Sequence, residues 1–123
     1  MNAAQARRNV ERQIARNPSS IAIKRMREVD DGAGGSYRET VGLPAQTVRI
    51  FMSTFAGTDA KDSTGSGGHI QTQRWGLLAM WDADIIRGDT FTHQGRQFRV
   101  RAISPASTGG QTTAIHADLE EAS

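Results

Sequence analysis

The chain has 123 residues, of which 37% are hydrophobic, 23% are charged and none is cysteine, and its formal net charge is +2. This length allows one domain with a modest core, and the lack of cysteine excludes both a disulfide framework and a thiolate metal site. The longest apolar stretch, residues 76–81, is far shorter than the roughly 20 residues of a membrane-spanning helix. No apolar segment of a secretory signal follows the basic start, so we expect a soluble protein made in a reducing cytosol.

Residues 2–16 are predicted to form a helix. A narrow apolar stripe recurs there at spacings of three and four residues, at Ala3, Ala6, Val10 and Ile14. Asn17 and Pro18 end the helix, because a proline disfavours helical geometry in the residue before it. The stripe can lie on the chain's own β domain or dock on a neighbouring subunit, and the sequence leaves both open. We therefore divide the chain into an N-terminal helix or arm, residues 1–17, and a β domain, residues 18–123.

After the proline the hydrophobic period changes to two, which predicts β-strands. Alternating segments occur at residues 21–24, 36–41, 46–53, 70–81, 90–92, 98–102 and 113–120, with turns at 30–36 and 93–96 and a loop at 105–110. The segment 70–81 is apolar on both faces, which predicts a central strand or one covered by the helix. About six strands with one N-terminal helix predict a mostly β protein, a small antiparallel β-barrel.

A long flexible loop is predicted within residues 55–69, projecting from the barrel. Its sequence, FAGTDAKDSTGSGG, is rich in glycine, serine, threonine and aspartate and has no hydrophobic period. Its GSGG lacks the GK[ST] ending and the following helix of a phosphate-binding P-loop. A flexible loop is therefore favoured over a phosphate cradle.

No pattern of residues predicts catalysis, a cofactor or a metal site. Asp82, Asp84 and Asp89 lack the spacing of a calcium loop, and we interpret them as solvated turn residues. The three histidines have no carboxylate or second histidine at a spacing that predicts a shared site, and no serine lies in a nucleophile-elbow sequence. We therefore expect a protein that is not an enzyme and that needs no cofactor.

Basic residues concentrate in two places. Up to Glu28 the chain holds seven basic and two acidic residues, whereas acidic residues gather near the other end. Arg96, Arg99 and Arg101 share a segment with Phe98, as on a barrel face that stacks bases. Alternation places Phe98 in the core, so the arginines form an exposed face for phosphate or for the acidic residues of another subunit. A stand-alone small barrel that binds nucleic acid or protein stays open as an alternative.

Three stretches resemble the head-closure, or stopper, proteins of tailed bacteriophages, also described as head–tail joining or neck proteins. They are IAIKRMRE with its glycine-rich turn and SYRETVG, then GDTFTHQGRQFRV from Gly88 to Val100, and ISPASTGGQTTAIHADLEE from Ile103 to Glu121. Together they cover most of the chain from Ile21 onward. The N-terminal helix departs from the simplest members of this family, so head–tail adaptors and tail terminators are near alternatives.

The resemblance implies a structural virion protein that forms a homo-oligomeric ring, six-fold or twelve-fold, at the head–tail junction. Such a ring lies between the portal or adaptor above and the tail terminator or tail protein below. It continues the channel for packaged double-stranded DNA, retains that DNA and presents a docking face for the tail. Assembly would take place in the host cytoplasm, with no membrane involved.

The resemblance also implies roles for particular residues. The long loop becomes a channel gate, with Phe55, Asp59, Lys61, Asp62, Gly65, Gly67 and Gly68. Half of its residues, fully extended, would reach roughly 23 Å. Subunit or ring contacts are expected from the basic start, the basic strand and the acidic end, at Arg7, Arg8, Val10, Arg12, Ile14, Arg96, Arg99, Arg101, Asp118, Glu120 and Glu121.

Overall fold

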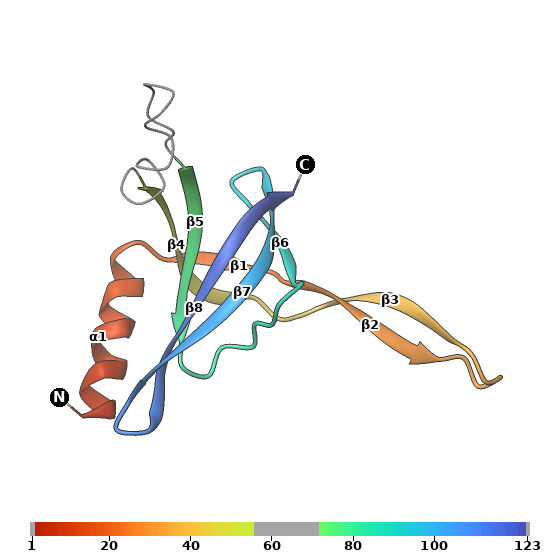
Figure 1. Ribbon diagram of the computed structural model, residues 1–123, viewed down its shortest axis with the longest axis horizontal. Helices are drawn as coiled ribbons and strands as arrows, with labels where there is room; N and C mark the ends of the chain where they lie inside the picture. Colours follow the sequence, from red (N-terminus) through yellow and green to blue (C-terminus); the bar gives the residue numbers. More distant parts are fainter. Residues whose placement is uncertain (1, 56–71, 123) are drawn as a thin grey trace, which may run out of the picture.

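The computed structural model describes residues 2–55 and 72–122, and of residues 53–55, 72 and 73 it describes the backbone alone. Within this part the elements are α1 (Ala3–Arg16), β1 (Ser19–Ile21), β2 (Lys24–Asp30), β3 (Ser36–Gly42), β4 (Gln46–Phe55), β5 (Thr72–Met80), β6 (Thr90–His93), β7 (Arg96–Thr108) and β8 (Gln111–Ala122) (Figure 1). The predicted mostly β chain with one N-terminal helix is confirmed. Most of the predicted gate loop lies outside the described residues.

The described strands form one antiparallel sheet in the order β1-β4-β5-β8-β7-β6-β2-β3. This corrects the prediction of a barrel with about six strands, because residues 2–55 and 72–122 contain eight strands and their hydrogen-bonded order is open. One end of the order, β1, continues along the chain through Ala22 and Ile23 into β2, which lies next to the other end. The carbonyl of Ile23 accepts a hydrogen bond from the Leu43 amide at 2.9 Å. Its partner is therefore in the loop between β3 and β4 and not in a strand.

The core lies inside the curl of the sheet. Phe98 is fully buried and packs against Trp75 and Phe91, with ring centroids 5.0 and 5.7 Å away. The core position predicted for Phe98 is therefore confirmed. Aliphatic side chains surround the rings, namely Ile21, Ile23, Val48, Ile50, Leu77, Val100 and Leu119.

The predicted loop at residues 105–110 is wrong, because β7 continues through it to Thr108 and only Gly109 and Gly110 make the turn to β8. Pro105 favours a loop in the sequence, because proline has no backbone N–H to donate to the hydrogen bonds of a sheet. Here β6 pairs with β7 only as far as Arg99, so Pro105 lies where the outer edge of β7 has no paired strand among the described residues. Two register shifts, near Val100 and near Ala106, accompany this stretch.

The helix lies on the outer face of β8, β5 and β4, where its apolar stripe is used within the chain. Ile14 is 4% exposed and packs with Leu78 and Ala114 in a second hydrophobic cluster. Asn2 caps the helix: its side chain accepts a hydrogen bond from the Gln5 amide at 2.8 Å, and the Gln5 side chain accepts one from the Asn2 amide at 3.1 Å. The sequence left open whether the apolar stripe packs on the chain's own β domain or on a neighbouring subunit, and the structure shows it on the chain's own sheet.

Replacing Ile14 by alanine should lower the free energy of unfolding by about 2–4 kcal/mol, because the change opens a cavity between helix and sheet. The control is Gln13→Ala at the exposed neighbouring position, which should change the free energy of unfolding by less than about 0.5 kcal/mol. Urea unfolding followed by circular dichroism measures both values. Equal, small effects at the two positions would mean that the helix does not pack on the sheet in solution.

Candidate assembly interface

A two-stranded arm projects from the body of the molecule. The arm consists of β2, β3 and the turn of residues 31–35, and in Figure 1 it extends to the side opposite α1. Its strands pair with each other from Lys24↔Gly42 to Asp30↔Ser36, whereas β2 touches the rest of the sheet's ladder only at Lys24↔Thr90. The arm is therefore a hairpin with almost no sheet beside it.

The turn at the tip is fixed by local hydrogen bonds. Gly32 and Gly34 have φ values of +78° and +88°, which glycine adopts without the strain of a side chain. One oxygen of Asp30 accepts from the Gly32 amide, and one oxygen of Asp31 accepts from the amides of Ala33 and Gly35. The tip thus holds a defined shape and carries two exposed carboxylates.

Both faces of the arm are solvent-exposed in the single chain. Met26 on one face is 58% exposed and Tyr37 on the other is 51% exposed. Tyr37 lies opposite Val29 in the ladder, and Arg27 forms an ion pair with Glu39 on the same face. An isolated two-stranded hairpin is at best marginally stable in water, so an arm of this kind favours a partner that covers it.

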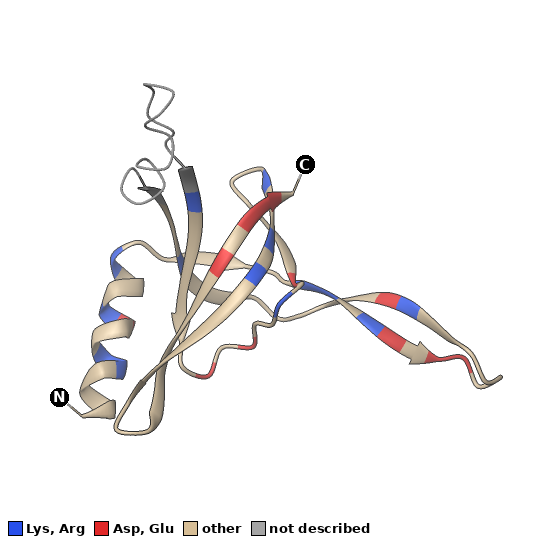
Figure 2. Cartoon of the chain, in the orientation of Figure 1, with Lys and Arg blue, Asp and Glu red and all other residues tan. Residues whose placement is uncertain are grey.

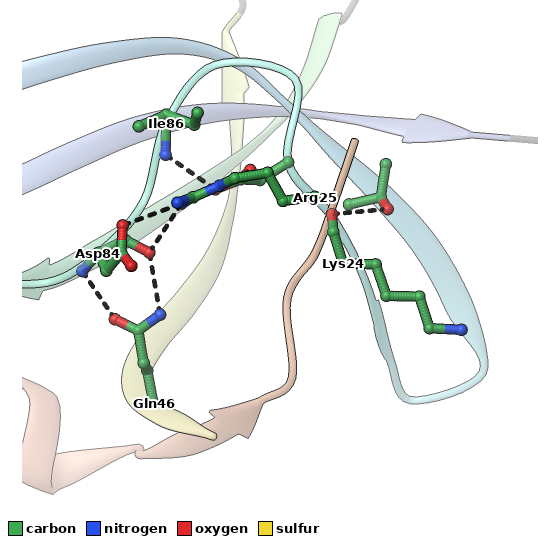
Figure 3. A network of polar contacts seen from close by, with 7 residues as sticks. Lys24, Arg25, Gln46, Asp84 and Ile86 are labelled. Atoms are coloured by element: carbon green, nitrogen blue, oxygen red, sulfur yellow. Dashed lines mark hydrogen bonds and ion pairs between the residues drawn. The ribbon is translucent and has the colours of Figure 1, made fainter. Parts of the chain in front are cut away.

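An ion pair between the partly exposed Arg25 and the buried Asp89 fixes the base of the arm to the body. Arg25 donates from Nε and Nη2 to the two carboxylate oxygens of Asp89, at 2.8 and 2.9 Å, and Asp89 is only 1% exposed (Figure 3). The Ile86 amide also donates to Asp89 at 2.8 Å. These hydrogen bonds compensate a carboxylate that would otherwise be very costly to bury.

Two further residues extend this network. Arg25 also donates to the Asp84 carboxylate at 3.0 Å, and the Gln46 side chain exchanges two hydrogen bonds with the backbone of Asp84, at 2.9 and 3.0 Å (Figure 3). Hydrogen bonding to Asp89, with a further contribution from Asp84, raises the pKa of Arg25 above its usual value. The interpretation of Asp89 as a solvated turn residue is therefore wrong, because its partner comes from a distant part of the chain.

The structure divides the predicted N-terminal interface residues into two groups. Arg7, Val10 and Ile14 contact the chain's own sheet: Arg7 donates to the Thr112 carbonyl at 3.0 and 2.9 Å and lies 3.9 Å from the centre of the Trp81 ring. Arg8 and Arg12 are exposed, and Figure 2 shows basic residues along the helix. The exposed pair is the part of this group that another molecule can contact directly.

The predicted basic strand is largely neutralised by the predicted acidic end. Arg96 pairs with Glu121 at 3.3 Å, and Arg99 pairs with Glu120 through Nε at 2.7 Å, both across β7 and β8. Arg101 and Asp118 are exposed. Four of these six residues therefore contact each other within one chain, which leaves little free positive charge on this face.

The remaining sequence predictions fall outside the described structure or find no site there. The gate residues Asp59, Lys61, Asp62, Gly65, Gly67 and Gly68 and the side chain of Phe55 lie outside the described residues. No group of three His, Asp or Glu side chains in the described part is arranged to hold a metal ion. In residues 2–55 and 72–122, no helix combines the length and the apolar character needed to cross a membrane.

Sequence reasoning did not single out the arm or its anchor. The sequence predicts a strand at residues 36–41 and a turn at 30–36 but no strand over residues 25–29, where charged residues interrupt the apolar alternation. The available signal is a pair of strand-length segments with a glycine-rich turn between them and charged residues on both faces. Such a hairpin has no place in a core and must project.

Comparisons with known proteins identify little. No family model matches the chain, and no curated protein does. Among solved structures, a chain of the "Virion of native gene transfer agent (GTA) particle" is similar with a TM-score of 0.47 and 18% identity, over 85% of this chain and 94% of that one. A TM-score below 0.5 is too low for this likeness to indicate what the present chain does.

Replacing Arg25 by leucine should lower the free energy of unfolding by about 3 kcal/mol, because Asp89 would remain buried without its counter-charge. Arg27→Leu is the matched control on the same strand. Its partner Glu39 is 37% exposed, so the loss should stay below about 1 kcal/mol. Denaturant unfolding gives both values, and hydrogen exchange of the β3 amides should accelerate in the Arg25 variant only. A similar loss in both variants would contradict the anchoring role.

Proposed function

We propose that this chain is a structural protein of a tailed-phage virion, which forms a ring at the head–tail junction. The ring closes the DNA-filled capsid and presents a docking face for the tail. The observation that carries the proposal is the exposed arm, with Met26 and Tyr37 uncovered on its two faces. A hairpin with both faces exposed is typical of a segment that other subunits cover in an assembly.

The resemblance of three sequence stretches to head-closure proteins supports this particular assembly. Those stretches include the whole arm, since IAIKRMRE, the glycine-rich turn and SYRETVG make up β2, the tip and β3. They also include Asp89, which anchors the arm. Head–tail adaptors and tail terminators would use an arm in the same way, and they remain the alternatives within this class.

The alternative of a stand-alone nucleic-acid-binding barrel finds less support. Its candidate surface was the basic strand, yet Arg96 and Arg99 form ion pairs with Glu121 and Glu120. Phosphate contacts would have to compete with these carboxylates. In the proposed ring, DNA passes through the channel and is not gripped by the protein. The gate role of the loop within residues 55–69 remains a prediction from the sequence.

Electron microscopy of lysates can test the virion role. In the phage or prophage that carries this gene, a nonsense codon should produce separate tails together with heads that have lost their DNA. Supplying the intact gene in trans is the control and should restore tailed particles. Intact, tailed and infectious particles from the nonsense mutant would rule out the proposed function.

Free DNA should bind the purified protein no more tightly than non-specific binding, with a dissociation constant of about 10⁻⁴ M or weaker at physiological salt. The reason is the internal pairing of the basic strand. Fluorescence anisotropy of a labelled duplex, repeated over a range of salt concentrations, measures this affinity. Tight binding with a steep salt dependence would favour the nucleic-acid-binding module instead.

A further inference from the structure

One face of the arm has the composition of a docking surface. Tyr37, Val29 and Val41 share this face, and its charged residues are already paired, Arg27 with Glu39 and Arg25 with Asp89. Tyrosine is the type of side chain that anchors protein interfaces, because it combines a large apolar surface with few rotatable bonds. The face therefore combines apolar side chains with charges that are already paired.

A groove at the other side of the molecule can receive such a face. It lies between the C-terminal half of α1 and the sheet, has a volume of about 330 Å³, and is lined mainly by apolar atoms of Glu11, Ile14, Ala15, Pro18, Thr47 and Met80. Ala15 and Pro18 are exposed in the single chain. The groove is therefore accessible and has no polar group that demands a particular small ligand.

The charges around the two surfaces are complementary. The outer half of the arm is net negative (Figure 2): Asp31 lies in the turn, and Glu28 and Asp30 lie on the face opposite Tyr37, where Glu28 is paired in the ladder with Arg38. Beside the groove, Arg8, Arg12 and Arg16 recur every four residues along one stripe of the helix, and all three are exposed. None of them has an ion-pair partner among the described residues. Glu11 is the single acidic residue of the helix.

The positions of the two surfaces determine the geometry of the contact. The arm and α1 lie at opposite ends of the molecule (Figure 1), so an arm cannot reach the groove of its own chain. We propose that the arm of one copy docks in the α1 groove of the next copy, with Tyr37 in the groove and the acidic tip against the arginine stripe. Such a contact between different surfaces repeats head to tail and builds a ring, or an open filament if the rotation does not close.

This inference rests on the proposed function in that it names the contact by which the ring would assemble. It concerns a second copy of the chain and no other partner. The arm contributes the apolar anchor and the negative charge, and the helix contributes the groove and the positive charge. Because each copy carries both halves of the contact, each copy can bind two neighbours.

Cross-linking can detect the contact without interference, because the chain has no cysteine of its own. A double variant, Ala15→Cys with Glu39→Cys, places one thiol in the groove and one on the Tyr37 face of the arm. A short bis-maleimide should link it into a ladder of dimers, trimers and larger species on a denaturing gel. The matched control, Ala15→Cys with Thr40→Cys, moves the arm thiol to the opposite face and should give at least five-fold less product. Equal ladders, or no ladder, would overturn the inference.

Complementary variants test whether the contact runs head to tail. Tyr37→Asp disables the arm and Ala15→Glu disables the groove, and both positions are exposed, so both variants should keep the wild-type unfolding midpoint. Each variant alone should be monomeric in sedimentation velocity. Mixed in equal amounts, they retain one intact arm–groove pair and should form dimers that grow no further. If mixing restores nothing, as for an arm that binds another arm, the inference is wrong.

These results are separable from the fate of the proposed function. Loss of DNA from nonsense-mutant heads together with an absent cross-link would keep the virion role and reject the arm–groove contact. A specific cross-link together with normal nonsense-mutant particles would keep the self-assembly and reject the virion role.

Discussion

The ion pair between Arg25 and the buried Asp89 is the interaction on which the position of the arm depends. Arg25 is the second residue of the arm, and Asp89 lies just before β6, so the pair joins the projecting hairpin to the edge of the body. Asp89 also holds the Ile86 amide, and its own backbone bonds to the Val100 amide at 2.8 Å. One residue thereby links the arm and a loop through its carboxylate and β7 through its backbone carbonyl. With one hydrogen-bonded rung to β6, the arm depends on this pair for its direction.

The body and the arm differ in whether their faces are covered by other parts of the chain. In the body, two hydrophobic clusters lie on the two faces of the same strands, since β5 contributes Leu77 to the inner cluster and Leu78 to the cluster under the helix. A strand that is apolar on both sides is stable only when both sides are covered, and α1 covers the outer one. The arm has charged and apolar residues on both faces and nothing over either. The body thus covers both of its apolar faces within one chain, whereas the arm leaves both of its faces exposed.

Much of this architecture is predictable from sequence wherever the signal is local. The spacing of Ala6 and Ile14 with the stop at Asn17-Pro18 predicts α1, and the alternation around Phe98 predicts its burial; both are confirmed. The open sheet was not predictable in this way, because it depends on where the chain leaves the ladder between β1 and β2. The role of Asp89 was missed because its partner Arg25 is 64 positions away and the local sequence is that of an ordinary turn. The candidate interface was found only in part, since charge patterns do not reveal which arginines are already paired within the chain.

The place of β8 in the sheet has a consequence for how the chain folds during its synthesis. β8 comes last in the described chain, yet it lies in the middle of the sheet, between β5 and β7. Until residues 111–122 have left the ribosome, β1, β4 and β5 on one side cannot join β7, β6, β2 and β3 on the other. Contacts between such distant segments form slowly, and unpaired strand edges are prone to aggregation while they wait. A chain cut short before Gln111 would therefore yield two half-sheets with exposed edges, so only translation through β8 completes the sheet.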